Sequence, residues 1–199
     1  MQTTDAIVRA AGSLFAERGY DCTPIAEIAD LAGVAAGTII YHFKRKECLL
    51  AEVALRHLRG LHAFCQEHSA RGATGLDSVL LFVDAYHRYL REHPAESAAY
   101  LKNHPAEKLK SAQDLAPDIS AAERSLLLLL QCLLILGVND GSISAREVAV
   151  SARSIQAMLL GGAFLVLFQN GDAKSLAENA THCVRRMLSD IAPTCTAAV

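Results

Sequence analysis

The stretch TPIAEIADLAGVAAGTIIYHFKRK, residues 23–46, decides how the N-terminal part of this chain folds. Thr23 followed by Pro24 predicts a helix start, because Thr can cap free backbone N–H groups and Pro fits the first helical position. Gly33 then predicts a turn, since glycine readily adopts positive φ. A second short helix is expected after the turn. Two short helices joined by a glycine-containing turn indicate a helix-turn-helix motif at residues 24–43.

The second half of this stretch carries a more specific pattern. AGV at residues 32–34, followed by TIIYHFKRKE at residues 38–47, resembles the signature of the tetracycline-repressor (TetR) family of bacterial regulators. The similarity is clear over residues 5 to about 55, and the remainder matches in helix layout. The resemblance implies an all-α chain with an N-terminal three-helix DNA-binding domain, residues 1–47. A larger helical domain for ligand binding and dimerisation would occupy residues 48–199.

The second helix of the motif would lie in a DNA major groove, as the resemblance implies. Thr38, Tyr41 and His42 offer a hydroxyl, a stacking ring and two ring nitrogens for base edges or the nearby backbone. Gly37 would permit close approach, and Lys46 matches a lysine that grips phosphate in the family. The expected DNA-contacting residues are Thr23, Ala36, Gly37, Thr38, Tyr41, His42 and Lys46.

Some residues depart from the family pattern and support a second hypothesis. Ala35 and Ala36 stand where relatives often carry Ser and Lys, and Ala35 cannot cap the helix, which costs about 1 kcal/mol relative to Ser. Ile40 replaces a tyrosine that usually contacts phosphate. Residues 1–60 contain seven Lys/Arg and seven Asp/Glu, so the expected DNA-binding domain is neutral. The alternative is an all-helical small-molecule-binding protein or enzyme with a degenerate DNA-binding domain.

Composition places the chain among packed globular proteins. Apolar residues make up 52% of the 199 residues and charged residues 20%, and the net charge of −2 argues against a general nucleic-acid coat protein. The six cysteines have no paired spacing, which predicts reduced thiols. Residues 1–15 do not resemble a signal peptide, and the apolar runs at 126–136 and 157–168 are shorter than the roughly 20 residues of a membrane span. We therefore expect a cytoplasmic protein without a membrane partner.

Motifs typical of enzymes do not occur in the sequence. GxSxG, GxGxxG and HExxH are absent, and the eight histidines are scattered without metal-ligand spacing. We therefore expect no catalytic residue, no cofactor and no metal site.

The C-terminal half predicts a homodimer. Capping boxes that begin at Ser120 and Ser144 predict helix starts there, and Asp172 is expected to cap the last helix. The helix predicted at 144–169 is apolar on nearly all sides, so a partner must cover it. Together with the helix at 173–191 it would form a two-fold, four-helix interface. The expected interface residues are Ala157, Gly161, Phe164, Leu165, Phe168, Val184 and Leu188.

A ligand pocket is expected among residues 76–165. Largely apolar helices with a few polar groups are typical of small-molecule sites. The candidate pocket residues are Tyr86, Tyr89, Tyr100, His104, Gln131 and Gln156. By resemblance, a small apolar or amphipathic effector would bind there and release a repressor from a palindromic double-stranded operator.

Overall fold

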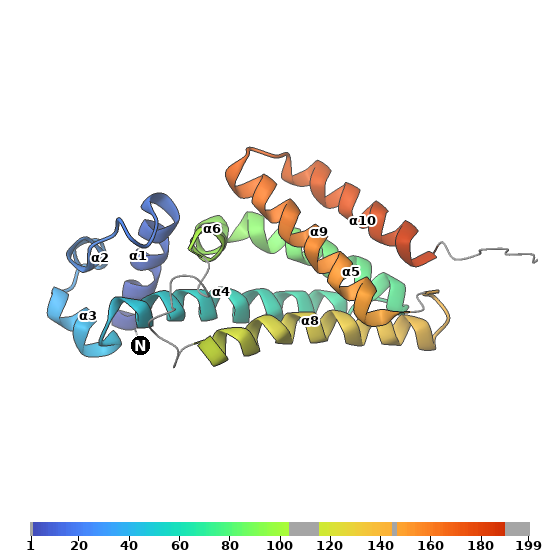
Figure 1. The fold of residues 1–199 in the computed structure, drawn as a ribbon, viewed down its shortest axis with the longest axis horizontal. Helices are drawn as coiled ribbons and strands as arrows, with labels where there is room; N and C mark the ends of the chain where they lie inside the picture. The colour runs from blue at the N-terminus through green and yellow to red at the C-terminus, as the bar shows by residue number, and fades with distance from the viewer. Residues whose placement is uncertain (1, 104–115, 145–146, 190–199) are drawn as a thin grey trace, which may run out of the picture. The chain divides into compact units, whose positions relative to one another are not determined.

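The computed structural model describes residues 2–103, 116–144 and 147–189, in which every regular element is an α-helix (Figure 1). The prediction of an all-α chain is confirmed. The helices are α1 (Gln2–Arg18), α2 (Ile25–Ala32), α3 (Ala36–Phe43), α4 (Lys46–Ser69), α5 (Gly75–Glu92), α6 (Pro94–Lys102), α8 (Ala116–Asn139), α9 (Val148–Phe168) and α10 (Ala173–Ser189).

The described residues form two compact units. The first unit comprises those within Met1–Ala63 and Tyr89–Leu126, and the second comprises those within Phe64–Arg88 and Leu127–Val199. Helices α4, α5 and α8 therefore contribute residues to both units. The expected functional boundary after residue 47 does not coincide with this division, and it remains a prediction.

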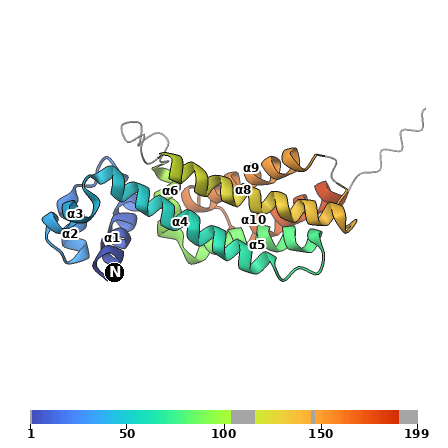
Figure 2. The same ribbon diagram turned by 90° about the horizontal axis from the view of Figure 1, so that it is seen from below.

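The first unit is organised around α1, which packs against α2 and α6. Figure 2 shows α1, α2 and α3 gathered beside the start of α4. Ile7 and Phe15 of α1 meet Ile28 of α2, Ile39 of α3 and Leu50 of α4 in one core, and all five side chains are almost completely buried. This core fixes the position of the helix-turn-helix in the first unit.

Glycines end the first two helices of this unit. Gly19 follows α1 with φ 85°, and Gly33 closes α2 with φ 68°. The backbone N–H groups of Gly33 and Val34 donate to carbonyls in the last turn of α2. Gly19 and Gly33 both occupy the left-handed region that favours glycine. The predicted turn at Gly33 is therefore confirmed.

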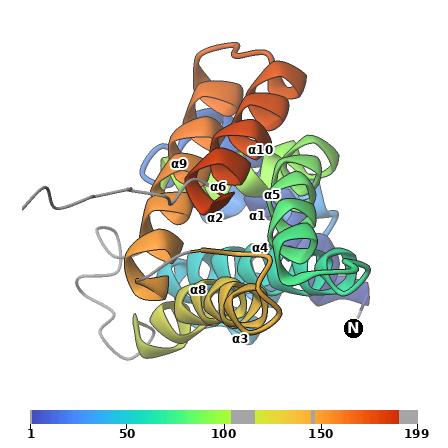
Figure 3. The same ribbon diagram turned by 90° about the vertical axis from the view of Figure 1, so that its right-hand side faces the viewer.

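The second unit contains α9 and α10, which lie side by side (Figure 3). The start of α5 is held in this unit by the turn after α8. The Gly75 backbone N–H donates to the Asp140 carboxylate at 2.6 Å, and the Leu76 N–H donates to Ser142 Oγ at 3.0 Å. These bonds satisfy backbone donors that a helix N-terminus otherwise leaves open.

Two of the three helix starts expected in this part of the chain differ from the structure. Helix α8 begins at Ala116 instead of Ser120, because Pro117 suits a first helical turn. Helix α9 begins at Val148, since the Ser144 backbone N–H donates instead to the Leu188 carbonyl at 3.0 Å. Asp172 does cap α10, because its carboxylate accepts the N–H groups of residues 174 and 175.

The expectation that no segment is long enough to cross a membrane is wrong. By length and composition, α8 with 24 residues and α9 with 21 residues both qualify, at mean hydropathies of 1.8 and 1.5. The bent pair of α2 and α3 passes the same test only if both helices are counted as one span. The error arose because the sequence argument counted uninterrupted apolar runs, whereas a span tolerates a few polar residues.

Candidate nucleic-acid interface

Helix α3 buries one face and exposes the other. Ile39 and Phe43 are 0% and 8% exposed and anchor the helix in the core of the first unit. Tyr41 is 73% exposed and Ile40 is 47% exposed. The exposed residues of α3 are Ala36, Gly37, Ile40, Tyr41 and His42, and Thr38 is half-buried. A rigid helix thus presents five of the predicted DNA-contacting residues in one short segment.

Gly37 is not required by the fold of its own chain. A Cβ atom built on Gly37 would meet no atom within 4 Å, whereas Gly33 has a positive φ that side chains disfavour. The space over Gly37 is therefore open to another molecule. An approaching phosphate or base edge would come closer here than over any larger residue.

Tyr41, His42 and Lys44 form an exposed group at the end of α3. The rings of Tyr41 and His42 are 5.2 Å apart, and Lys44 Nζ lies 5.4 Å from the centroid of the Tyr41 ring. Lys44 has φ 64° and closes α3 through its backbone N–H to the Ile40 carbonyl. Lys44 is not among the residues that the sequence predicted to contact DNA. The KRK run at 44–46 was the signal for a further cation beside the predicted contacts.

Lys46 is held against the loop that joins α1 and α2. Its ammonium donates to the Tyr20 carbonyl, and Nζ lies 4.3 Å from the centroid of the Tyr20 ring. Burial lowers the pKa of Lys46, and the carboxylates of Asp21 and Glu47 oppose that shift. Burial and the carboxylate of Glu47 raise the pKa of Tyr20 to about 12. Because an ammonium has three donors, a fixed Lys46 can still bind phosphate.

Thr23 corrects the sequence prediction. The residue is completely buried, and its hydroxyl donates to the Gly19 carbonyl at 2.7 Å and the Leu14 carbonyl at 3.4 Å. Pro24 occupies the N-cap position of α2, where no side chain caps the helix. Thr23 therefore ties α1 to the start of α2, and it cannot contact DNA in this structure.

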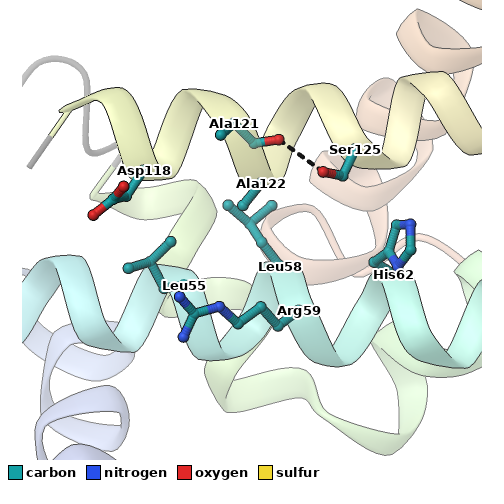
Figure 4. Close-up of a pocket in the computed structure, with 8 residues that line it drawn as sticks. All are labelled: Leu55, Leu58, Arg59, His62, Asp118, Ala121, Ala122 and Ser125. Atoms are coloured by element: carbon teal, nitrogen blue, oxygen red, sulfur yellow. Dashed lines mark hydrogen bonds between the residues drawn. The ribbon is translucent and has the colours of Figure 1, made fainter.

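A groove lies between α4 and α8 within the first unit (Figure 4). Its volume is about 480 Å³. Four residues from each helix line it: Leu55, Leu58, Arg59, His62, Asp118, Ala121, Ala122 and Ser125. Both sets follow the spacing i, i+3, i+4, i+7, which places four side chains on one face of a helix.

The predicted pocket residues do not line this groove. Tyr89 and Tyr100 are buried in the first unit, where their hydroxyls donate to the His57 carbonyl and the Glu123 carboxylate. Tyr86 is buried in the second unit, and burial raises its pKa. Gln131 and Gln156 are half-buried there as well, and His104 falls outside the described residues. The set is thus divided between two units.

The predicted dimer residues fall into two groups. Ala157, Gly161, Phe164, Leu165 and Phe168 are all exposed along α9, with Phe164 51% exposed. Val184 and Leu188 of α10 are completely buried within their own chain, so their assignment to an interface is wrong. The apolar stripe of α10 packs inward because α9 lies against it.

Metal chemistry finds no support in the described part of the chain. Those residues contain no group of three or more His, Cys, Asp or Glu side chains that could hold a metal ion. The five cysteines that the structure describes are free thiols, and burial raises the pKa of Cys65 to about 12. That thiol stays protonated at neutral pH.

Comparison with known proteins assigns the helix-turn-helix. Residues 7–53 match the family model described as bacterial regulatory proteins, tetR family. The HTH-type transcriptional repressor KstR2 of Mycolicibacterium smegmatis is 41% identical over 49 residues, which are 25% of this chain and 24% of that protein. The sequence match thus spans about a quarter of the length of this curated relative. The family-model match at residues 7–53 includes α2 and α3 and most of α1.

Solved structures extend the likeness to the whole fold. A tetR-family regulatory protein from Rhodococcus RHA1 superposes with a TM-score of 0.80 at 20% identity, over 96% of this chain and 100% of that chain. The regulator FadR from Bacillus subtilis, solved in complex with stearoyl-CoA, gives 0.79 at 22% identity over 94% and 99%. Residues 7–53 thus match the helix-turn-helix region of tetR-family bacterial regulatory proteins, and the fold of the described residues is that of solved tetR-family structures.

Proposed function

We propose that this protein is a dimeric DNA-binding regulator that releases a palindromic operator when a small effector binds. The supporting observation is the exposed face of α3, which the buried Ile39 and Phe43 hold rigidly. The family model that matches residues 7–53 describes bacterial regulatory proteins, and the matched residues include this helix. A DNA-binding regulator acts in the cytoplasm.

Helix α3 would enter the major groove. Thr38, Tyr41 and His42 would contact base edges or the nearby backbone, and Gly37 with Ala36 would allow the backbone of α3 to approach DNA closely. Lys44 and Lys46 would neutralise phosphates. Because residues 1–60 carry equal numbers of Lys/Arg and Asp/Glu, binding would depend on these placed contacts, and its salt dependence would reflect the small number of phosphates that they neutralise.

The dimer would form through α9. The exposed Ala157, Gly161, Phe164, Leu165 and Phe168 make one continuous helical face, and a two-fold partner presents the same face in return. A two-fold dimer carries two copies of α3, so the operator would be an approximate palindrome. Its half-sites would lie about 34–36 Å apart, one turn of DNA.

The effector would be a small apolar or amphipathic molecule. The FadR structure contains stearoyl-CoA, a long acyl chain with a charged group, and that regulator shares the fold of this chain. Binding among residues 76–165 would shift α4, which begins three residues after α3. A shift between two mostly exclusive states requires a difference in binding of several kcal/mol, about 5.5 for a change from 1:99 to 99:1.

The decisive experiment measures operator affinity by fluorescence anisotropy with DNA from upstream of the gene. Gly37→Leu should abolish binding, because the added side chain fills space that the chain itself leaves open. Lys46→Ala should weaken binding to all sequences and reduce the salt dependence by about one ion per subunit. His42→Ala should change sequence preference instead.

The matched control is Ala63→Leu, which places the same leucine side chain at an exposed position of α4 in the first unit. It should bind like the unaltered protein. Thermal unfolding should be similar for Gly37→Leu and Ala63→Leu, since neither position is packed. If Gly37→Leu binds operator as well as Ala63→Leu does, α3 is not the DNA-binding helix. The degenerate-domain alternative would then be favoured.

A further inference from the structure

The groove between α4 and α8 has an apolar floor and a polar rim. Leu55 and Leu58 are 9% and 4% exposed, and they face Ala121 and Ala122 across the groove (Figure 4). Alanines leave room where larger residues would fill the space between two helices. A volume of about 480 Å³ lies within the range of about 300–1,000 Å³ that small-molecule sites occupy.

The charges at the rim are unequal. Arg59 and His62 come from α4, whereas Asp118 is the single carboxylate among the described residues that line the groove. Arg59 is exposed and has no ion pair or hydrogen bond within the described residues. Asp118 lies in the first turn of α8, where the helix dipole partly compensates its charge. The groove therefore offers, beside apolar walls, a guanidinium that has no partner among the residues that the structure describes.

We propose that this groove binds an amphipathic anion, with a carboxylate or phosphate on Arg59 and an apolar body on Leu55, Leu58 and the two alanines. A guanidinium forms two parallel hydrogen bonds with such groups, which makes it the preferred partner for them. The His62 imidazole lies on the Ser125 side of the groove and can donate a further hydrogen bond (Figure 4). None of the residues predicted for the effector pocket contributes to this site.

Binding is tested without DNA, so failure of the proposed DNA-binding function would not affect the result. Isothermal titration uses decanoate and decyl phosphate as anions, and decanol and decyltrimethylammonium as neutral and cationic analogues, all below their aggregation concentrations. We expect one molecule of either anion per chain. The neutral and cationic analogues should bind about tenfold more weakly or not at all, because they cannot use the guanidinium.

Three substitutions test the charges at the rim and the volume of the groove independently. Arg59→Gln should weaken anion binding about tenfold, and Asp118→Asn should strengthen it, because it removes the opposing charge. Ala122→Phe should abolish binding by filling the groove. Ala121→Phe, at an exposed rim position, serves the same purpose if Ala122→Phe does not fold. Arg91→Gln, another exposed arginine of the first unit, is the matched control and should bind normally.

Several results would overturn the proposal. Equal affinity for decanol and decanoate would remove the role of Arg59. Unchanged decanoate binding in both Arg59→Gln and Ala121→Phe would place the ligand elsewhere. Tighter binding of the cationic analogue, abolished by Asp118→Asn, would assign the opposite charge preference to the groove.

Discussion

The two units of this protein differ in how many large apolar side chains they expose. Among the described residues of the first unit, the large exposed apolar ones are Leu31, Ile40 and Tyr41, all within the helix-turn-helix. Among those of the second unit, ten large apolar ones are exposed, including Leu160 and Phe164 of α9. In its described part, the first unit thus buries most large apolar groups in its own core and exposes a few in the helix-turn-helix, the motif that is proposed to bind DNA. The second unit leaves an apolar surface that a partner subunit is proposed to cover.

The largest difference between the two units is expected in the loss of stability when a phenylalanine of each is replaced by alanine. Phe15→Ala removes a completely buried ring from the first unit and should lower the free energy of unfolding by about 3–5 kcal/mol. Phe164→Ala removes a half-exposed ring and should change the stability of the separate subunit by less than about 0.5 kcal/mol. Urea unfolding at two protein concentrations measures both.

Concentration is the control in this experiment. The deficit of Phe164→Ala should appear at high concentration, where the unaltered protein is dimeric, and vanish on dilution. The deficit of Phe15→Ala should persist on dilution. A Phe164→Ala deficit that does not depend on concentration would show that this ring stabilises its own chain.

A buried histidine should make the first unit sensitive to acid. His57 stacks on Tyr100 at 5.1 Å, and its Nδ1 has no hydrogen-bond partner among the described residues. Burial, and secondarily His93, lower the pKa of His57 to about 4 from 6.5. Between pH 6.5 and pH 4, the imidazole of His57 therefore binds a proton in the unfolded chain but stays neutral in the folded chain. Stability should fall as pH decreases from 6.5 to 4, by about 3 kcal/mol in total.

His57→Phe should remove this part of the pH dependence. Its unfolding free energy, measured at intervals from pH 7 to pH 4.5, should fall less steeply than that of the unaltered protein. His182→Gln, at an exposed position of α10, should retain the full slope. Parallel curves for His57→Phe and the unaltered protein would show that His57 does not cause the acid sensitivity.

Substitutions at two adjacent glycines of α9 should affect dimerisation and subunit stability differently. A Cβ on Gly161 would meet no atom of its own chain within 4 Å, whereas a Cβ on Gly162 would lie 3.2 Å from His87 Nε2. Gly161→Leu should therefore leave the subunit folded and weaken the dimer by about 1–3 kcal/mol, the usual cost of overpacking. Gly162→Leu should instead lower the stability of the subunit.

Sedimentation at micromolar concentration and thermal unfolding distinguish these outcomes. Gly161→Leu should contain more monomer than the unaltered protein. A fully dimeric Gly161→Leu would count against the placement of the interface on α9.

The smallest expected effects concern helix caps in the two units. Ala35 has the extended backbone of an N-cap, with φ −71° and ψ 144°, but no side-chain hydrogen bond. Ala35→Ser should therefore stabilise the first unit by about 1 kcal/mol. Asp172 caps α10 through its carboxylate, so Asp172→Ala should destabilise the second unit by a similar amount. Thermal unfolding of both variants checks the signs, and a loss of stability in Ala35→Ser would contradict the first.

Local patterns in the sequence determined the helical architecture and the DNA-binding motif. Gly33 indicated the turn because few other residues adopt its positive φ, and the two short helices on either side of it indicated the helix-turn-helix. Asp172 indicated a cap because its carboxylate reaches N–H groups only two and three residues away. Each of these inferences depends on neighbours in the chain, which the sequence contains.

The tertiary structure decided which apolar surfaces are covered and where polar groups lie. Val184 and Leu188 share a face with helical spacing, but spacing does not tell whether α9 of the same chain or a partner covers that face. The sequence predicted that Thr23 caps α2, but its hydroxyl instead donates hydrogen bonds to carbonyls of α1 and of the turn after it. The groove joins Leu55–His62 to Asp118–Ser125, more than fifty residues apart. Contacts at such separations depend on how whole helices pack, because periodicity along one helix does not encode the position of another.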